Sequence, residues 1–143
     1  MTIARILAYK GRRVVTAQPE RTLQEISAQL IRHAVGALVV VDANEDIVGL
    51  VSERDVVAAI ASHGPDVLFN TVAQHMTTNP IVAAEDDTVD STMETMTRER
   101  RRHLPVVHNG RLAGLVSIGD VVKYRIEAIE YERKSLHDYI TSA

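Results

Sequence analysis

The chain has 143 residues, no cysteine and a formal net charge of −3. Without cysteine it forms no disulfide or thiolate metal site, and the acidic balance argues against nucleic-acid binding. Hydrophobic residues make up 45% of the chain and aromatic residues only 3%, so we expect one domain with an aliphatic core. No signal-peptide pattern and no apolar run of membrane length is found, and we expect a cytoplasmic protein with no membrane contact.

The first half of the chain predicts a β-α-β-β-α unit after an N-terminal segment over residues 1–13. An extended piece at 14–17 precedes a helix with apolar residues at helical spacing: Leu23, Ile26, Leu30 and Ile31. Strands over 37–41 and 47–51 follow as a hairpin, and their near-continuous Val and Leu content indicates burial on both faces. Ser52 then starts a second helix, which the sequence His63-Gly64-Pro65 ends.

The second half repeats this order. A short linker helix over 71–76 and Asn79-Pro80 precede the following elements: an extended piece over 81–83, a helix with apolar Val89, Met93 and Met96, strands over 104–107 and 112–116, and a helix from Ser117. The dipeptide Asn109-Gly110 predicts a two-residue turn between the two strands.

The two units are copies of one another. Residues 49–57 and 114–122 are identical at seven of nine positions, at an offset of 65. We therefore predict an α/β (α+β) fold with two pseudo-symmetric repeats, over 14–70 and 71–124, followed by a C-terminal helix extension over 125–143. Neither half, at roughly 60 residues, buries much surface alone, so the copies are expected to pack as one domain.

The last helix carries a heptad pattern that its counterpart lacks. Apolar residues and one arginine recur at 4,3,4,3,4 spacing: Val122, Ile126, Ile129, Arg133, Leu136 and Ile140. Near Val122 we expect this face to cover the chain's own core. Beyond Ile129 no partner remains within the repeat, and we expect contact with a second subunit.

Each copy ends its hairpin with Ser-x-x-Asp at the start of a helix. One interpretation is a capping box, in which the serine accepts from an amide of the first turn and the aspartate reaches back. The other is a ligand site. Asp55 and Asp120 can each accept two hydrogen bonds from a ribose diol, while Ser52 and Ser117, with the helix-start amides, suit a phosphate. The two interpretations are compatible.

The two copies differ in charge beside this motif. Copy two has a basic run over residues 98–103 that ends in Arg102 and His103, whereas the equivalent part of copy one is nearly neutral. The run either forms a solvated helix end, which suits the helix dipole, or binds phosphate, for which the planar arginine side chain is well shaped. Arg54 has Gly119 as its counterpart, and it can supply charge from the other side. We therefore expect two clefts of unequal affinity or ligand.

Taken together, these features resemble the paired cystathionine-β-synthase (CBS) domain, or Bateman module. The carriers are the tandem β-α-β-β-α unit, Leu-Pro-Val-Val at 104–107, the two Gly-hydrophobic-x-Ser-x-x-Asp segments, and Val72-x-x-x-Met76-Thr77 before copy two. The resemblance covers roughly residues 14–124. It implies two three-stranded sheets covered by helices, two clefts between the copies, and association of two modules into a disc.

The resemblance also implies a function and a set of site residues. Family members bind adenine nucleotides or related adenosyl compounds, which here implies regulatory AMP or ATP binding, with Asp55 and Asp120 at the ribose and Ser52, Arg54, Ser117, Gly119, Arg102 and His103 at the phosphate. The adenine walls implied by analogy are Thr16, Ala17, Thr78, Pro80, Ile81, Val82 and Pro105, although plain core packing explains each apolar member as well.

Two alternatives remain open: NAD or another adenosyl ligand, and a ligand-free module that mediates dimerisation or protein interaction. The partners expected are the nucleotide, a second copy through the CBS helices and the C-terminal helix, and an unknown protein. The six histidines show no metal-binding spacing, and no catalytic motif is present. We expect no metal, no catalytic cofactor and no enzymatic activity.

Overall fold

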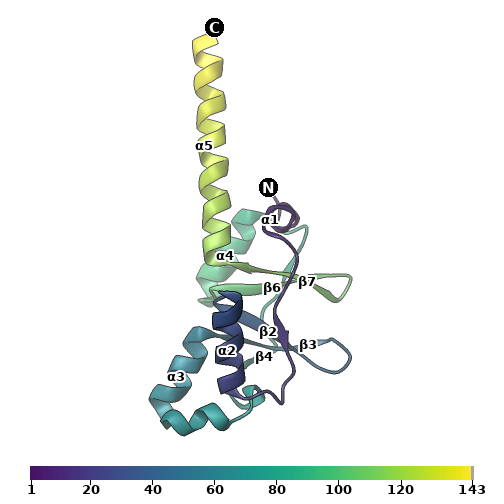
Figure 1. The fold of residues 1–143 in the computed structure, drawn as a ribbon. Helices are drawn as coiled ribbons and strands as arrows, with labels where there is room; N and C mark the ends of the chain where they lie inside the picture. Colours follow the sequence, from purple (N-terminus) through teal and green to yellow (C-terminus); the bar gives the residue numbers. More distant parts are fainter. Residues whose placement is uncertain (143) are drawn as a thin grey trace.

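Two hairpins of Val- and Leu-rich strands form the centres of two lobes in the computed structural model, which describes residues 1–142 (Figure 1). The first repeat comprises β1 (Thr16–Ala17), α2 (Leu23–His33), β2 (Ala37–Val41), β3 (Ile47–Ser52) and α3 (Glu53–His63). The second comprises β5 (Ala83–Ala84), α4 (Val89–Glu99), β6 (His103–His108), β7 (Arg111–Ser117) and α5 (Ile118–Ser142). The predicted β-α-β-β-α order is confirmed in both copies.

The two sheets have the same plan. In each, the first short strand runs parallel to the second, and the second pairs antiparallel with the third. Asn109 and Gly110 have φ angles of 51° and 73°, as the predicted turn requires. The first sheet gains a fourth strand, β4 (Thr77–Thr78), which pairs with β3. The expected pair of three-stranded sheets is therefore correct only for the second repeat.

Three groups of apolar side chains hold the lobes together. One fills the first repeat around Leu23, Ile26 and Leu38, and another fills the second around Leu104 and Val116. A smaller third group, centred on Ala37, Val39 and Leu50, brings in Leu112 and Leu115 from the second repeat. This third group packs the two sheets against each other. In α2, Leu23, Ile26 and Leu30 are buried as the helical spacing predicts, but Ile31 is exposed.

Each repeat is completed by the segment that precedes the other repeat. Residues 1–13, predicted only as an N-terminal segment, contain the helix α1 (Ile3–Lys10), and its Ile3, Ile6 and Leu7 are fully buried in the core of the second repeat. The linker between the repeats packs instead on the first one, through Val72 and Met76. The predicted linker helix is a 3-10 turn, η2 (Val72–Gln74), which follows another, η1 (Pro65–Phe69).

Two pairs of contacts show that residues 1–13 and the linker each pack on the repeat that they do not directly precede. We call these two stretches the exchanged segments. Thr2 bridges to Thr88 at the start of α4, and Thr71 bridges to Thr22 at the start of α2. A Cβ atom added at Gly114 would lie 2.6 Å from Leu7, and one added at Gly49 would lie 2.3 Å from Met76. Both motif glycines therefore leave room for an apolar side chain from the exchanged segment. Thr2-Ile3-Ala4 and Thr71-Val72-Ala73 lie at a constant offset of 69 and are themselves a weak repeat.

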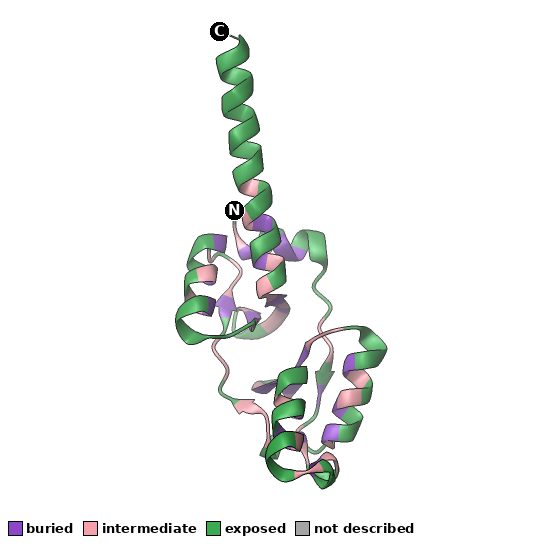
Figure 2. Ribbon diagram, turned by 90° about the vertical axis from the view of Figure 1, so that its left-hand side faces the viewer, coloured by how far each residue is buried: buried purple, intermediate pink, exposed green. Residues whose placement is uncertain are grey.

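Helix α5 leaves the body of the protein after its first turns (Figures 1 and 2). Val121 and Tyr124 are buried against the second repeat, whereas Val122 is 39% exposed. The expectation that the heptad face covers the core near Val122 is wrong, because the buried stripe lies one residue earlier. The helix is long but polar, and none of the helices formed by residues 1–142 has the apolar length needed to cross a membrane.

Candidate functional site between the repeats

The two Ser-x-x-Asp motifs form matching capping boxes. In the first, the amide of Asp55 donates to Ser52 Oγ at 3.2 Å and the amide of Ser52 donates to Asp55 Oδ2 at 2.8 Å. In the second, the corresponding distances for Ser117 and Asp120 are 3.1 and 2.9 Å. The capping interpretation is confirmed in both copies. Each carboxylate retains Oδ1, because the cap uses only Oδ2.

A cleft of about 660 Å³ lies at the start of α3, between the two repeats. This volume is within the range of small-molecule sites. The first repeat contributes the start of α3, and the second contributes the end of α4 and the beginning of β6. Five of the residues predicted for the ligand line this cleft together: Ser52, Arg54, Asp55, Arg102 and His103.

The end of α4 brings the basic run across from the motif of the other copy. Arg100 ends this helix in a left-handed conformation with φ of 54°, and the amide of Arg101 returns to the carbonyl of Met96 at 3.0 Å. The chain then turns so that residues 100–103 face Ser52 and Asp55. Among residues 1–142, Arg100, Arg101 and Arg102 make no ion pair, so their charges are free to meet an anion.

His103 lies where the two repeats touch. A Cβ atom added at Gly36 of the first repeat would lie 3.2 Å from His103 Nε2, so the ring fits against the bare backbone there. Burial lowers the pKa of His103, with Lys10 and Arg102 adding to this effect and Glu53 and Asp120 opposing it. The ring is therefore neutral near pH 7 and can donate one hydrogen bond and accept another.

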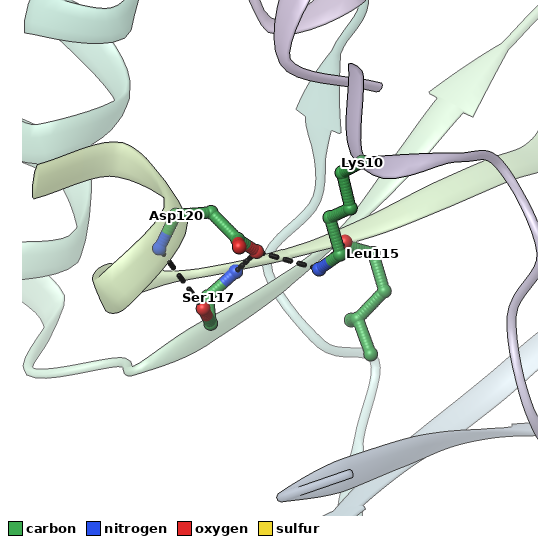
Figure 3. A network of polar contacts seen from close by, with 4 residues as sticks. All are labelled: Lys10, Leu115, Ser117 and Asp120. Carbon is green, nitrogen blue, oxygen red and sulfur yellow. Dashed lines mark hydrogen bonds and ion pairs between the residues drawn. The ribbon is translucent and has the colours of Figure 1, made fainter. Parts of the chain in front are cut away.

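Asp120, in the motif of the second repeat, is already in contact with a cation (Figure 3). Lys10 Nζ lies 2.5 Å from Asp120 Oδ2 and donates to the carbonyl of Leu115 at 2.7 Å. Burial acts to raise the pKa of Asp120, but the hydrogen bonds from Lys10 and Ser117 outweigh it and hold the pKa below its ordinary value. Lys10 was not among the residues predicted for the site. The signal that points to it is the weak repeat of residues 2–4 in residues 71–73, which aligns Lys10 with Asn79 beside the predicted Thr78 and Pro80.

The residues predicted as adenine walls come from both repeats and lie on several elements. Thr16 and Ala17 line a different cavity of about 580 Å³, between β1, α2 and the turn after β2. Ile81 packs on the core of the second repeat, and Val82 is exposed. The remaining members are placed as follows: Thr78 pairs with Gly49, Pro80 lies between β4 and β5, and Pro105 is buried on β6 opposite Leu115. Gly119, predicted at the phosphate, is exposed in the first turn of α5.

The arrangement offers hydrogen-bond acceptors, cations and helix-start amides, which are groups that bind a ligand. No cluster of three or more His, Asp or Glu side chains within residues 1–142 is arranged to hold a metal ion. The chemistry that this site supports is therefore recognition of a polar, anionic small molecule.

Comparison with known proteins places this geometry in a family. The CBS domain matches the chain twice, over residues 9–62 and 72–127. The chain belongs to the CBS domain family. A solved CBS-domain containing protein from Agrobacterium tumefaciens is 44% identical, with a TM-score of 0.85, and the match covers 87% of this chain and 99% of that one. The mitochondrial CBS domain-containing protein CBSX3 of Arabidopsis thaliana is 31% identical over 97% of this chain and 71% of its own length.

A third relative was solved with ligands. It is a CBS domain pair in complex with 5′-methylthioadenosine and S-adenosyl-L-methionine, 26% identical, with a TM-score of 0.80, and the match covers 90% of this chain and 98% of that one. The recognition of a tandem CBS module from the sequence is confirmed. The matched ranges also include residues 9–13, which were predicted to lie outside the repeats.

Proposed function

We propose that this CBS pair is a regulatory module that binds an adenine nucleotide, AMP or ATP, in the cleft lined by Asp55. The observation that carries the proposal is that Asp55 of one repeat lies across the same cleft from Arg102 and His103 of the other. A carboxylate at a helix start accepts hydrogen bonds from a ribose diol, and arginine side chains bind phosphate. The ligand thus bridges the two repeats, and its binding changes how firmly they are held together.

The related CBS pair solved with two adenosyl compounds supports the ligand class. Those compounds carry no phosphate, whereas the cleft beside Asp55 is lined by Arg54, Arg100, Arg101 and Arg102. Among adenosyl ligands, this concentration of positive charge favours those with a phosphate. The same reasoning keeps NAD, which also carries phosphates and ribose, as the nearest competitor.

Calorimetry on protein freed of co-purified ligand tests the proposal. We expect AMP to bind more tightly than adenosine, because only AMP has a phosphate. The variant Asp55→Asn retains an oxygen for the cap but loses the charge, and we expect it to weaken AMP binding about 10- to 100-fold. Glu25→Gln is the matched control, because Glu25 caps α2 in the same way outside this cleft. If Asp55→Asn and Glu25→Gln bind AMP equally, Asp55 is not a ligand residue.

We also propose that a second copy of the chain covers the heptad face of α5. Ile126, Ile129, Leu136 and Ile140 are each about half exposed or more, and all residues from 129 to 142 are exposed. Most of the stability of a helix in a protein comes from packing its apolar face, and this face is exposed in the single chain. When two α5 helices run parallel, heptad positions five residues apart bring Arg125 near Glu130, and Glu132 near His137. Arg125 and Glu130 carry opposite charges.

Light scattering on the purified chain tests this second copy. We expect a dimer whose dissociation constant rises at least tenfold in Leu136→Gln, because the change puts a polar group into the seam. Ser135→Gln places the same side chain one residue away, outside the seam, and is expected to leave the dimer intact. A dimer that survives both Leu136→Gln and removal of residues 130–143 would show that α5 is not its interface. Val57 on α3 and its counterpart Val122 are also exposed, and they would then be the next surface to test.

A further inference from the structure

Lys10 is bound to Asp120, the carboxylate at which a second ribose is expected. Its ammonium group is held by two atoms of the second repeat: the carbonyl oxygen of Leu115 at 2.7 Å and Asp120 Oδ2 at 2.5 Å (Figure 3). The side chains of Lys10 and Asp120 are 34% and 25% exposed, so the pair lies partly out of water. Screening by solvent is weaker there than at the surface.

The position of Lys10 is set by the core of the protein. It is the last residue of α1, whose Ile3, Ile6 and Leu7 are fully buried. The helix ends at Gly11, whose amide donates to the carbonyl of Leu7 at 2.7 Å. A helix anchored in this way delivers the lysine to Asp120 with little loss of chain entropy, unlike a lysine on a mobile surface segment.

The ion pair makes the two motif aspartates unequal as ligand residues. Asp120 Oδ2 accepts from both the Ser117 amide and Lys10, whereas Asp55 Oδ2 accepts from the Ser52 amide alone. Within residues 1–142, Asp55 makes no ion pair. A ribose diol that approaches Asp120 must therefore displace Lys10, or donate its hydrogen bonds to a carboxylate whose charge Lys10 already neutralises.

The linker places no cation beside Asp55. Counted from the bridging residues Thr2 and Thr71, the position equivalent to Lys10 is Asn79, at the same offset of 69 that relates Leu7 to Met76. Asn79 is neutral. The cation at Asp120 therefore comes from a residue of the N-terminal segment whose counterpart in the linker is uncharged.

We infer that Lys10 is a selectivity residue of the Asp120 site, where it competes with the ribose of an adenosyl ligand for Asp120. This inference rests on the proposed function, because it assumes that the motif aspartates bind ribose. The Asp55 cleft fills first, and the Asp120 site fills only at higher ligand concentration.

Isolating the Asp120 site gives a direct test. In an Asp55→Asn background, AMP binding reports on Asp120, and we expect Lys10→Met to tighten it about three- to tenfold, the range expected for removing one competing ion pair. Lys134→Met, on the exposed part of α5, is the matched control and is expected to change nothing. Lys10→Arg retains the cation and is expected to keep AMP binding weak.

In the Asp55→Asn background, unchanged or weaker AMP binding on adding Lys10→Met would overturn the inference. Weaker binding would mean that Lys10 contacts the ligand. Circular dichroism establishes that the variant is folded. If the wild type binds AMP but neither Asp55→Asn nor Asp55→Asn/Lys10→Met does, Asp120 is not a ribose site and the inference fails.

A second measurement separates this failure from that of the proposed function. Carboxyl NMR titration of the ligand-free chain is expected to give a higher pKa for Asp120 in Lys10→Met than in the wild type or Lys134→Met. An unchanged pKa would mean that Lys10 does not neutralise Asp120, and the competition would be excluded whatever the chain binds. If the pKa rises but no form of the protein binds AMP, adenosine or NAD, the proposed function fails, and with it the role of the ion pair in ligand selection.

Discussion

The two ends of the repeat interface share a motif but differ in what surrounds it. At both ends a serine and an aspartate cap a helix with nearly identical distances. The cleft at Asp55 is lined by four arginines that make no ion pair among residues 1–142, whereas Asp120 is paired with Lys10. Sequence repetition therefore duplicated the local structure without duplicating the electrostatics. Apart from Arg54, which lies inside the first motif, the charges that distinguish the two sites come from outside it: the end of α4 in one case and α1 in the other.

The largest expected effect tests whether α1 belongs to the second repeat. Ile3→Ala removes a fully buried side chain and is expected to lower the free energy of unfolding by about 2–5 kcal/mol. Val72→Ala is the counterpart at the other end, and its smaller side chain predicts a smaller loss. Urea denaturation measures both. A loss below about 1 kcal/mol for Ile3→Ala would mean that α1 is not part of the core.

The two motif glycines provide the next comparison. Gly114→Ala forces a methyl group against Leu7, which is branched and fully buried, and we expect a loss of about 1–3 kcal/mol. Gly49→Ala meets the flexible side chain of Met76, which is only partly buried, and methionine adapts to such changes at lower cost. Urea denaturation of the two variants is expected to rank Gly114→Ala as the less stable. The reverse order would show that α1 yields more easily than the linker does.

The capping boxes predict a smaller and nearly equal effect at the two ends. Ser52→Ala and Ser117→Ala each remove one cap and are expected to cost about 1 kcal/mol of unfolding free energy. Thermal denaturation of the ligand-free variants measures this. A difference much larger than the cap itself would mean that one serine has a further structural partner.

The smallest expected effect is a change in the titration of His103. Because its pKa lies below the ordinary value in the folded chain, acidification through about pH 6.5, the unfolded pKa, favours unfolding. A phosphate bound beside Arg102 stabilises the protonated ring, so AMP is expected to raise the pKa of His103 while adenosine raises it less. NMR titration of the ring protons measures the shift. No change with AMP would place the phosphate away from His103.

Much of the architecture was predictable because it depends on local patterns. The period of the apolar residues identified the helices and strands, and Asn109-Gly110 identified its turn. The exposed seam of α5 shows the limit of such patterns: a heptad period says which residues share a face, but not whether that face meets the chain's own core. In α5 the residues buried against the core are Val121 and Tyr124, which lie outside the heptad face.

By itself, the sequence determined the repeated β-α-β-β-α unit, the capped helix starts and the pairing of two CBS copies, because each is encoded over a few neighbouring residues. Only the tertiary structure decided which charges meet which aspartate. Residues 100–103 of the second repeat lie across from Asp55 of the first, and Lys10 reaches Asp120, 110 positions away. These contacts depend on the packing of α1 on the second repeat and of the linker on the first. That packing is set by buried side chains that lie far apart in the sequence.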